Sequence, residues 1–224
     1  MNSAIIVAAG SGSRLGGLKK QFLEIGGKIV LRRSVEKIIQ SGICDIIIST
    51  AAEDVGFVER MFSDHKKTVR VIAGGKTRQQ SVRNAFEICD GDGIVLIHDA
   101  ARPFVEVEHI VKVMEAAEEM GAAALGVAST DTVKFVENNL ITKTINRKNV
   151  YLIQTPQAFS KKIYRQSLNG ASGEYTDDCQ LVEKAGYDIK IVEGNKDNIK
   201  ITTIHDLKYA KFLAEIEAEN LKGD

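Results

Sequence analysis

Tryptophan is absent from this chain of 224 residues, and proline and cysteine are scarce, with two and three residues respectively. The cysteines are far apart and form no Cys-x-x-Cys pair, which argues against a disulfide framework or a zinc site and favours a reducing, cytoplasmic location. They are Cys44, Cys89 and Cys179. No apolar run approaches the ~20 residues of a membrane helix. An apolar run begins within the first few residues, so we expect neither a signal peptide nor membrane association.

An excess of charge of either sign is also lacking. Thirty basic and thirty acidic residues give a formal net charge of zero, which argues against general affinity for nucleic acid but leaves room for a local basic pocket. A hydrophobic content of 44% and a charged content of 27% are ordinary for a globular protein. The length suits one large domain, and we expect residues 1–224 to form a single domain.

Apolar runs typical of buried strands alternate with segments of helical periodicity in the first part of the chain. The expected strands are residues 4–9, 46–48, 69–72, 94–97 and 122–128, and the expected helices lie around 35–42, 55–62, 82–89 and 110–117. This alternation predicts an α/β fold with a mostly parallel, doubly wound sheet and helices on both faces. Ligands of such sheets bind beyond the carboxyl ends of the strands.

The alternation stops after residue 130. Residues 133–137 and 140–145 are β-prone and flank Asn138-Asn139, a favourable pair for a hairpin turn, so we expect a projecting β-ribbon arm at about 132–150. An exposed ribbon needs cover, often from a second subunit, and we therefore expect a homodimer. Beyond the arm we expect strands at 151–154, 189–192 and 199–202, a turn at 155–157, and helices around 160–168, 178–186 and 207–221.

The glycine loop after the first strand carries the clearest binding signal. Residues 4–22 read AIIVAAGSGSRLGGLKKQF, a buried strand followed by glycines and then by Arg14, Lys19 and Lys20, which is a suitable phosphate-binding arrangement. Leu15 stands where a dinucleotide fingerprint needs its third glycine, and no Gly-Lys-Ser/Thr triplet is present for a P-loop. A tight turn with solvated charges is the alternative that the loop alone leaves open.

Two further strands end in candidate binding residues. Asp99 follows the strand at 94–97 and is a candidate ligand for Mg²⁺, which favours one or two carboxylates plus substrate phosphates; a structural helix cap is the alternative. Gly74 and Gly75 end the strand at 69–72 and open a helix, where backbone groups can read the edge of a base. Arg78 beside them has either a binding or a surface role. His98 is interpreted as a packed histidine.

Taken together, these motifs resemble the 2-C-methyl-D-erythritol 4-phosphate cytidylyltransferases of the non-mevalonate isoprenoid pathway. The matching runs, in order between residues 8 and 202, are AAGSGSR, KQF, GGKTRQQSV, HDAARPF, DT, NR, QTPQAF, TDD and DNIKIT. The first run alone marks only a nucleotidyltransferase, whereas HDAARP with TPQ and DNIK is far more specific. The resemblance implies a Rossmann-like nucleotidyltransferase fold and a reaction in which the substrate's 4-phosphate attacks the α-phosphorus of CTP and pyrophosphate leaves.

The resemblance also implies roles for individual residues. Arg14 and Lys20 would stabilise the transition state, and Asp99 would hold Mg²⁺ or another divalent cation. The CTP pocket would be lined by Ala8, Ala9, Gly10, Gly12, Gly75, Arg78, Ser81, Ala100 and Arg102. The polyol phosphate would be positioned by Arg147, Lys200, Thr132 and Thr155. In the family the arm crosses to a partner subunit, so Thr132 and Arg147 would serve the neighbouring active site.

Two departures from the family pattern and two other functions stay open. Lys19 stands where most members have proline, so Lys19 competes with Lys20 as the phosphate cation, and Lys76 stands where an acid is common. A ribitol-5-phosphate cytidylyltransferase shares the loop, HDAxRPF and TPQ, although HDAAR and the Thr-Ile-Asn-Arg run favour the erythritol enzyme. A non-catalytic nucleotide-sugar-binding protein would not need Arg14, Lys20 and Asp99 together. A nicotinamide-dependent oxidoreductase is the most distant alternative.

Overall fold

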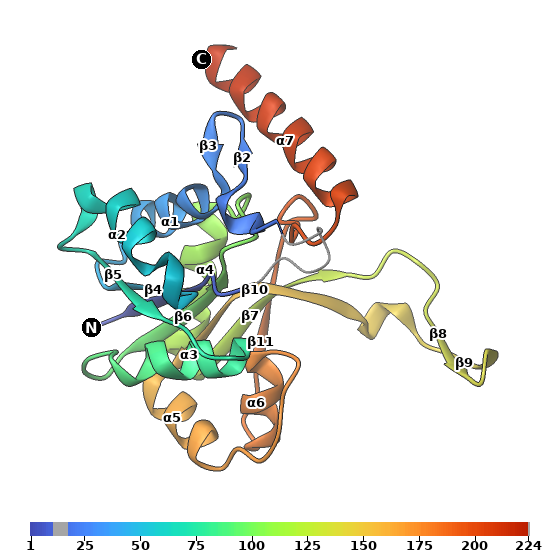
Figure 1. Cartoon of the computed structure of the whole chain (residues 1–224). Coiled ribbons are helices and arrows are strands. Elements are labelled where there is room, and N and C mark those ends of the chain that lie inside the picture. Colours follow the sequence, from blue (N-terminus) through green and yellow to red (C-terminus); the bar gives the residue numbers. More distant parts are fainter. Residues whose placement is uncertain (11–17, 224) are drawn as a thin grey trace.

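A seven-stranded sheet forms the centre of the computed structural model, which describes residues 1–10 and 18–223, with side chains as far as residue 220. The strand order is β11-β7-β10-β6-β1-β4-β5, and only β10 runs antiparallel to its neighbours. The strands are β1 Ser3–Val7, β4 Ile46–Thr50, β5 Val69–Ala73, β6 Ile94–Asp99, β7 Ala122–Ala128, β10 Tyr151–Ser160 and β11 Lys190–Glu193. The predicted mostly parallel α/β sheet is confirmed (Figure 1).

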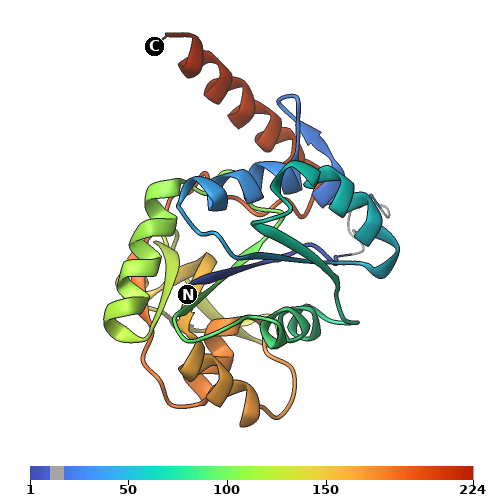
Figure 2. The ribbon, with the colours of Figure 1, turned by 90° about the vertical axis from the view of Figure 1, so that its left-hand side faces the viewer.

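Alternate residues of the central strands face opposite layers of helices. Ile6 and Ile48 belong to one core cluster, whereas Ile5 and Ile47 belong to another. The first layer contains α1 Val30–Gln40, α2 Val55–Met61 and α4 Val107–Met120, and the second contains α3 Arg78–Glu87, α5 Lys161–Asn169 and α6 Asp178–Lys184. Both faces of β1 and β4 are buried, so their unbroken apolar runs correspond to strands with no solvent-facing side. Helices cover both faces of the sheet, as predicted (Figure 2).

A small hairpin and the last helix form a third layer that extends away from the sheet (Figures 1 and 2). The hairpin strands are β2 Glu24–Ile25 and β3 Lys28–Ile29, which the sequence analysis missed, and the helix is α7 Ile204–Gly223. At the turn, Gly26 has a φ of +54°, and a Cβ there would lie 2.8 Å from the Cβ of Ala214 on α7. Only glycine therefore allows the hairpin to approach α7 this closely. Within the described part of the chain, every helix is too short or too polar to span a membrane.

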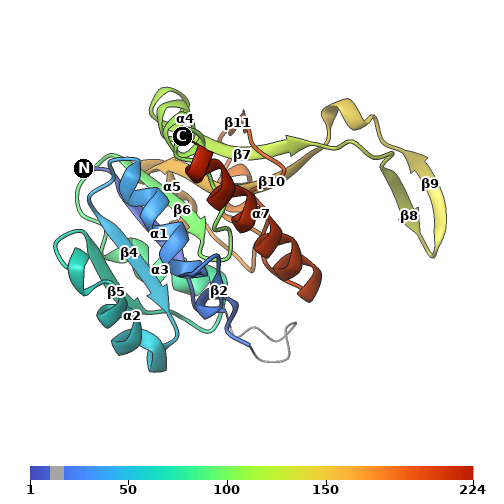
Figure 3. The ribbon, with the colours of Figure 1, turned by 90° about the horizontal axis from the view of Figure 1, so that it is seen from above.

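The arm is a second hairpin, β8 Lys134–Glu137 and β9 Leu140–Thr144, at the residues where the sequence predicts a ribbon. Its turn residues Asn138 and Asn139 have φ values of +49° and +64°, the left-handed conformation of a tight hairpin turn. The extended ends of β7 and β10 carry the hairpin far from the sheet (Figure 3). All its strand residues are exposed, including the apolar side chains of Phe135, Val136, Leu140 and Ile141. Short 3-10 turns complete the fold at Lys20–Phe22, Ala52–Asp54, Ser63–His65 and Arg147–Asn149.

Two sequence predictions in the second half were wrong. Residues 155–157 do not turn into a helix: β10 continues through this buried segment to Ser160, and it pairs with β7 on both sides of Thr155–Pro156 and with β6 from Gln157 onward. Its register shifts between Ile153 and Gln157, around a cis Thr155–Pro156 peptide bond. Residues 199–202 do not form a strand. Instead, Ile201 is fully buried in the cluster with α7, so its apolar character reflects helix packing and not sheet pairing.

Candidate active site

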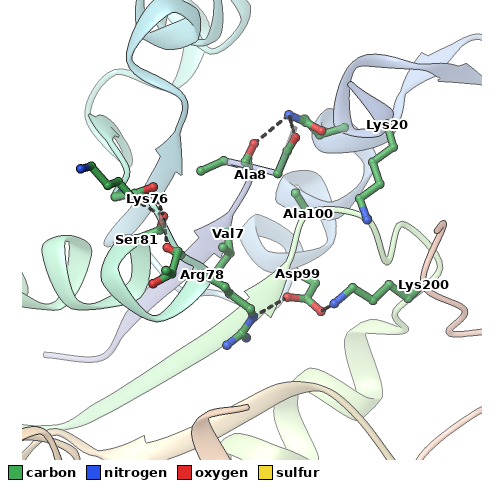
Figure 4. Close-up of a pocket in the computed structure, with 15 residues that line it drawn as sticks. Val7, Ala8, Lys20, Lys76, Arg78, Ser81, Asp99, Ala100 and Lys200 are labelled. Carbon is green, nitrogen blue, oxygen red and sulfur yellow. Dashed lines mark hydrogen bonds and ion pairs between the residues drawn. The ribbon is translucent and has the colours of Figure 1, made fainter. Parts of the chain in front are cut away.

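A cavity of about 310 Å³ lies at the carboxyl edge of the sheet, where β1 and β6 end side by side. Val7 of β1 pairs with Asp99 of β6, so the loops that follow both strands meet at this edge. The cavity is lined by Val7, Ala8, Ala9, Gly10, Lys20, Gln21, Gly75, Lys76, Thr77, Arg78, Ser81, Asp99, Ala100, Ala101 and Lys200 (Figure 4). Seven of the nine residues predicted to bind CTP, Arg78 among them, are therefore brought together here. Arg14 and Gly12, also predicted for this site, lie outside the described residues.

Asp99 is the only carboxylate among the described residues that line the cavity. Its Oδ2 lies 2.7 Å from the Nζ of Lys200, and its Oδ1 accepts a hydrogen bond of 3.1 Å from the Nε of Arg78 (Figure 4). Arg102 approaches the same carboxylate at 3.9 Å. Three cations thus converge on one buried acid from α3, from the loop after β6 and from the loop before α7.

These cations determine the charge state of the site. Burial alone would raise the pKa of Asp99, but Arg78, followed by Lys200 and Arg102, outweighs it and holds the pKa well below its ordinary range. Burial lowers the pKa of Arg102, although Asp99 partly offsets this effect. Asp99 is therefore a carboxylate at neutral pH, surrounded by more positive charge than it neutralises. Such a site suits an anionic ligand such as a nucleoside triphosphate.

A chain of hydrogen bonds beneath the cavity fixes the backbone of Asp99. The Asp99 N–H donates to the Oγ1 of Thr155 at 3.1 Å, and the Thr155 hydroxyl lies 3.1 Å from the Nδ1 of His98. The other ring nitrogen of His98 lies 3.1 Å from the carbonyl of Arg102, which can only accept, so Nε2 carries the proton and Nδ1 accepts from Thr155. Burial lowers the pKa of His98 to about 4 and keeps the ring neutral. Thr155, predicted to line the substrate side, lies under Asp99, and His98 is packed as predicted.

Asn198 positions the loop that carries Lys200. Its amide donates to the carbonyl of Thr155 at 2.9 Å and to the side chain of Gln154 at 3.1 Å. The backbone carbonyl of Asn198 accepts a hydrogen bond of 2.7 Å from the Nη1 of Arg102. Arg102, predicted to bind CTP, is thus a support between the Asp99 loop and the Lys200 loop, and it does not line the cavity.

The double glycine at the end of β5 forms the opposite wall. A Cβ on Gly74 would lie 2.9 Å from the Cβ of Ala9 and 2.7 Å from the Oγ of Ser81. The N–H of Gly75 donates to that same hydroxyl at 3.0 Å. Close packing of three loops therefore requires Gly74, and Ser81 fixes Gly75 at the cavity wall. Lys76, the departure from the family pattern, also lines this wall.

The adjacent lysines of the first loop have different surroundings. The Nζ of Lys19 lies 2.6 Å from Oδ2 of Asp54 and 3.1 Å from Oε1 of Glu53. The hydrogen bond to Asp54, followed by that to Glu53, raises the pKa of Lys19. Lys20 instead lines the cavity and points into it (Figure 4). Of the two lysines, therefore, Lys20 is the one that lines the cavity.

Gln21, in the same run, was quoted in the sequence analysis only as part of a motif. It is buried, and its amide donates to the carbonyls of Ala8 and Gly10 at 2.8 and 3.2 Å. Its side chain therefore fixes the start of the glycine loop. Its place between Lys20 and an apolar residue, in a run that matched the family, was the only sequence signal for this role.

Arg147 and Thr132 lie away from the cavity of their own chain. Arg147 is exposed at the base of the arm, where its Nη1 donates to the carbonyl of Thr130 at 2.8 Å, and Thr132 is exposed beside it. Neither residue lines the cavity. Within a single chain, therefore, the predicted polyol-phosphate residues divide into Lys200 at the cavity, Thr155 beneath it, and this pair on the arm.

The donor set for a metal is small. In residues 1–10 and 18–223 no group of three or more histidine, cysteine, aspartate or glutamate side chains could hold an ion. Of the described residues that line the cavity, Asp99 alone offers a carboxylate, and both its oxygens are already paired with cations. Mg²⁺ that arrives with nucleotide phosphates needs only one or two protein carboxylates. The residues therefore fit an ion carried in by a phosphorylated ligand and do not fit a resident ion.

Comparisons with known proteins agree with this architecture. A family model described as 2-C-methyl-D-erythritol 4-phosphate cytidylyltransferase matches residues 2–215. Proteins named 2-C-methyl-D-erythritol 4-phosphate cytidylyltransferase from Thermotoga neapolitana and Halalkalibacterium halodurans are 36% and 38% identical to the chain; each alignment covers 96% of this chain, and 97% and 98% of the relatives. The crystal structure of 4-diphosphocytidyl-2C-methyl-D-erythritol synthase from Anaerococcus prevotii superposes with a TM-score of 0.85 at 32% identity, covering 96% of this chain and 98% of that one.

Proposed function

The chain belongs to the family of 2-C-methyl-D-erythritol 4-phosphate cytidylyltransferases, and from this premise we propose that it transfers the cytidylyl group of CTP to 2-C-methyl-D-erythritol 4-phosphate. The products are 4-diphosphocytidyl-2-C-methyl-D-erythritol and pyrophosphate, and the reaction is a step of isoprenoid biosynthesis. The observation that carries the proposal is the cavity at the carboxyl edge, which Lys20 lines and where Arg78 and Lys200 pair with Asp99, the one carboxylate among its described lining residues.

The nucleotide end of the cavity is built mostly from backbone. Ala8, Ala9, Gly10 and Gly75 have little or no side chain, so a cytosine ring can approach their backbone closely. Ser81 holds Gly75, and Gln21 holds the carbonyls on the other side. Backbone groups fixed in this way can distinguish cytosine from other bases by its donors and acceptors.

The transfer step needs positive charge around the α-phosphate. A 4-phosphate oxygen of the acceptor attacks the α-phosphorus of CTP, a new P–O bond forms, and the bond to the bridging oxygen breaks so that pyrophosphate leaves with its electron pair. Negative charge builds on the oxygens of the α-phosphate in this step, and a fixed cation at that place lowers the barrier. Lys20, which points into the cavity, is the proposed cation, and Arg14 of the glycine loop is proposed as the second.

Lys200 is proposed to position the acceptor. Its ammonium group lies beside Asp99 at the cavity, on the side opposite the glycine wall, with 37% of its side chain exposed. An incoming phosphate can therefore replace or share the carboxylate as its partner. Mg²⁺ bound with the CTP phosphates would neutralise their charge, and Asp99 is the residue that would hold it.

A homodimer through the arm is part of the proposal. Leu140 and Ile141 are 70% and 66% exposed on the arm, and Leu152 at its base is 61% exposed. A second copy of the chain is the proposed cover, because it would also bring Thr132 and Arg147 to the polyol-phosphate side of a cavity that they do not reach in their own chain. Sedimentation of the full chain should give twice the monomer mass, and Leu140→Asp should reduce it to one; a wild-type monomer at assay concentration would contradict this part.

The proposed location is the cytoplasm. All three cysteines are free, and one of them, Cys44, is exposed, which suits a reducing compartment.

Pyrophosphate release tests the activity. The protein is incubated with Mg²⁺, each nucleoside triphosphate in turn, and methylerythritol, ribitol or erythritol phosphate. Turnover is expected with CTP and methylerythritol phosphate. Turnover with CTP and ribitol phosphate alone would make the chain a ribitol-5-phosphate cytidylyltransferase, and CTP binding without turnover on any acceptor would make it a binding protein.

A further inference from the structure

Arg78 is held between two buried carboxylates that come from different parts of the fold. Its Nε donates to Oδ1 of Asp99 at 3.1 Å, and its Nη1 donates to Oδ2 of Asp178 at 2.6 Å. The side chains of Asp99 and Asp178 are 8% and 4% exposed. Burial would lower the pKa of Arg78, but Asp178 and then Asp99 raise it far above its ordinary range. The guanidinium therefore has a fixed charge and a fixed orientation.

Tyr164 holds the second carboxylate from below. Its hydroxyl donates to Oδ1 of Asp178 at 2.6 Å, and the side chain is fully buried. The ring packs against Phe86 of α3 and Phe159 of β10, with centroid distances of 4.9 and 5.4 Å. Burial, followed by the neighbouring Asp178, raises the pKa of Tyr164 well above its ordinary value, so the hydroxyl remains a donor. A rigid core aromatic thus orients a carboxylate, which orients an arginine at the cavity.

Neither Tyr164 nor Asp178 lines the cavity, so neither can touch a ligand there directly. Their effect has to pass through Arg78 to Asp99. With Asp178 in place, one edge of the guanidinium is neutralised, and its Nε is aimed at Oδ1 of Asp99. Without the Asp178 charge, Arg78 would be free to turn toward an incoming phosphate, and Asp99 would lose its fixed orientation.

We propose that Asp178 and Tyr164 are positioning residues for the transfer reaction. They hold Arg78 so that it fixes Oδ1 of Asp99, which leaves Oδ2 to face Lys200 and a divalent cation carried in with the nucleotide. This inference rests on the cytidylyltransferase function proposed above. It predicts that Asp178 affects the contribution of Mg²⁺ to nucleotide binding, and not nucleotide binding in general.

Calorimetric titration of CTP into the full-length protein, once with EDTA and once with saturating Mg²⁺, separates the two effects. In Asp178→Asn the affinity measured in EDTA should be unchanged or higher, because Arg78 is less neutralised. The gain in affinity that Mg²⁺ confers should fall by about tenfold or more, as is usual when a residue supporting a metal ligand is changed. Tyr164→Phe keeps the packed ring and should lower the same gain by a smaller factor, about threefold.

Asp45→Asn is the matched control. Asp45 is also a buried carboxylate paired with an arginine, since its Oδ1 lies 2.6 Å from the Nη2 of Arg70, but it precedes β4 at the opposite edge of the sheet. This variant should lower the melting temperature and leave the Mg²⁺-dependent gain at its wild-type value.

Two results would overturn the positioning role. The first is that Asp178→Asn lowers the melting temperature and lowers both CTP affinities by one common factor, which is the behaviour of a purely structural residue. The second is that Asp178→Asn retains the full Mg²⁺-dependent gain in affinity. A wild-type protein that binds no CTP in either condition would instead contradict the proposed function itself, so the two failures are distinguishable.

Discussion

The ammonium group of Lys200 lies 2.7 Å from the carboxylate of Asp99, although the two residues come from opposite halves of the chain. The loop before α7 therefore completes a site whose other walls come from the loops after β1, β5 and β6. In this arrangement Lys200 is paired with Asp99. A phosphate of the ligand can replace Asp99 as the partner of Lys200, and a divalent cation can replace Lys200 as the partner of Asp99.

Lys200→Met should weaken binding of the acceptor more than binding of the nucleotide. The loss of a charged hydrogen bond to the acceptor phosphate should raise KM for methylerythritol phosphate by about 10- to 100-fold. Affinity for CTP in EDTA should change little, because Arg78 and Lys20 remain at the nucleotide side. Steady-state kinetics with each substrate varied in turn measure the two KM values separately. An increase confined to KM for CTP would contradict the role given to Lys200.

The two adjacent lysines should differ sharply in mutational effect. Lys20→Ala should lower kcat by about 10²- to 10³-fold, the usual cost of removing one group that stabilises transition-state charge. Lys19→Ala should leave kcat close to wild type, because the Lys19 ammonium is held by Asp54 and Glu53 away from the cavity. Equal losses of kcat in the two variants would show that both lysines serve the phosphate.

His98 should make the protein less stable in mildly acidic solution. Its pKa is lowered by burial to about 4, whereas the unfolded chain has the ordinary value of 6.5, so the unfolded state binds more protons between these two pH values. The free energy of unfolding should therefore fall by about 3 kcal/mol as the pH drops from 7 to 4. Asp99 adds little over most of this window, because its carboxylate is ionised in both states well above its ordinary pKa of 3.8; the stability that its lowered pKa provides is lost as the pH falls toward and below that value.

Urea unfolding in EDTA at several pH values measures this slope. His98→Gln, whose amide can still donate to the Arg102 carbonyl, should be less stable at pH 7 but lose the His98 part of the slope. If the free energy of unfolding falls equally with pH in the wild type and in His98→Gln, the acid sensitivity belongs to other groups.

A subunit-mixing experiment tests whether the arm serves the partner's site. Lys20→Ala and Arg147→Ala should each be nearly inactive alone. If Arg147 acts on the partner's cavity, each mixed dimer contains one site with both wild-type residues, and random mixing should restore about a quarter of the wild-type rate. If Arg147 acts on its own cavity, every site in the mixture keeps one defect and activity stays low.

Much of the sheet could be predicted because both of its faces are buried. The unbroken apolar runs at β1, β4 and β6 have no other plausible environment, and the polar residues that follow them identified the site edge. The path of β10 could not be predicted in this way. A proline normally indicates a turn, and only the neighbouring strands β6 and β7 show why the chain remains extended through Pro156.

The supporting residues of the site depend on tertiary partners that no local pattern reveals. The resemblance assigned the phosphate to Lys20 but left Lys19 as a competitor, and only the tertiary structure shows that Lys19 pairs with Asp54 and Glu53 whereas Lys20 lines the cavity. Thr155 and Arg102 were expected to face ligands, but the buried bonds of Thr155 to His98 and of Arg102 to Asn198 make them supports. Tyr164 has the spacing of an ordinary core aromatic, and its hydroxyl acquires a role only because α6 places Asp178 beside it.

The most direct test of the central proposal follows the α-phosphorus of CTP. CTP labelled at that atom is incubated with the protein, Mg²⁺ and methylerythritol 4-phosphate, and the products are separated. The proposed function predicts label in a cytidine diphosphate ester of the acceptor together with an equal amount of unlabelled pyrophosphate, and loss of both in Lys20→Ala. Label that stays in CTP, or that appears only in CMP or in a ribitol product when ribitol phosphate is supplied, would contradict it.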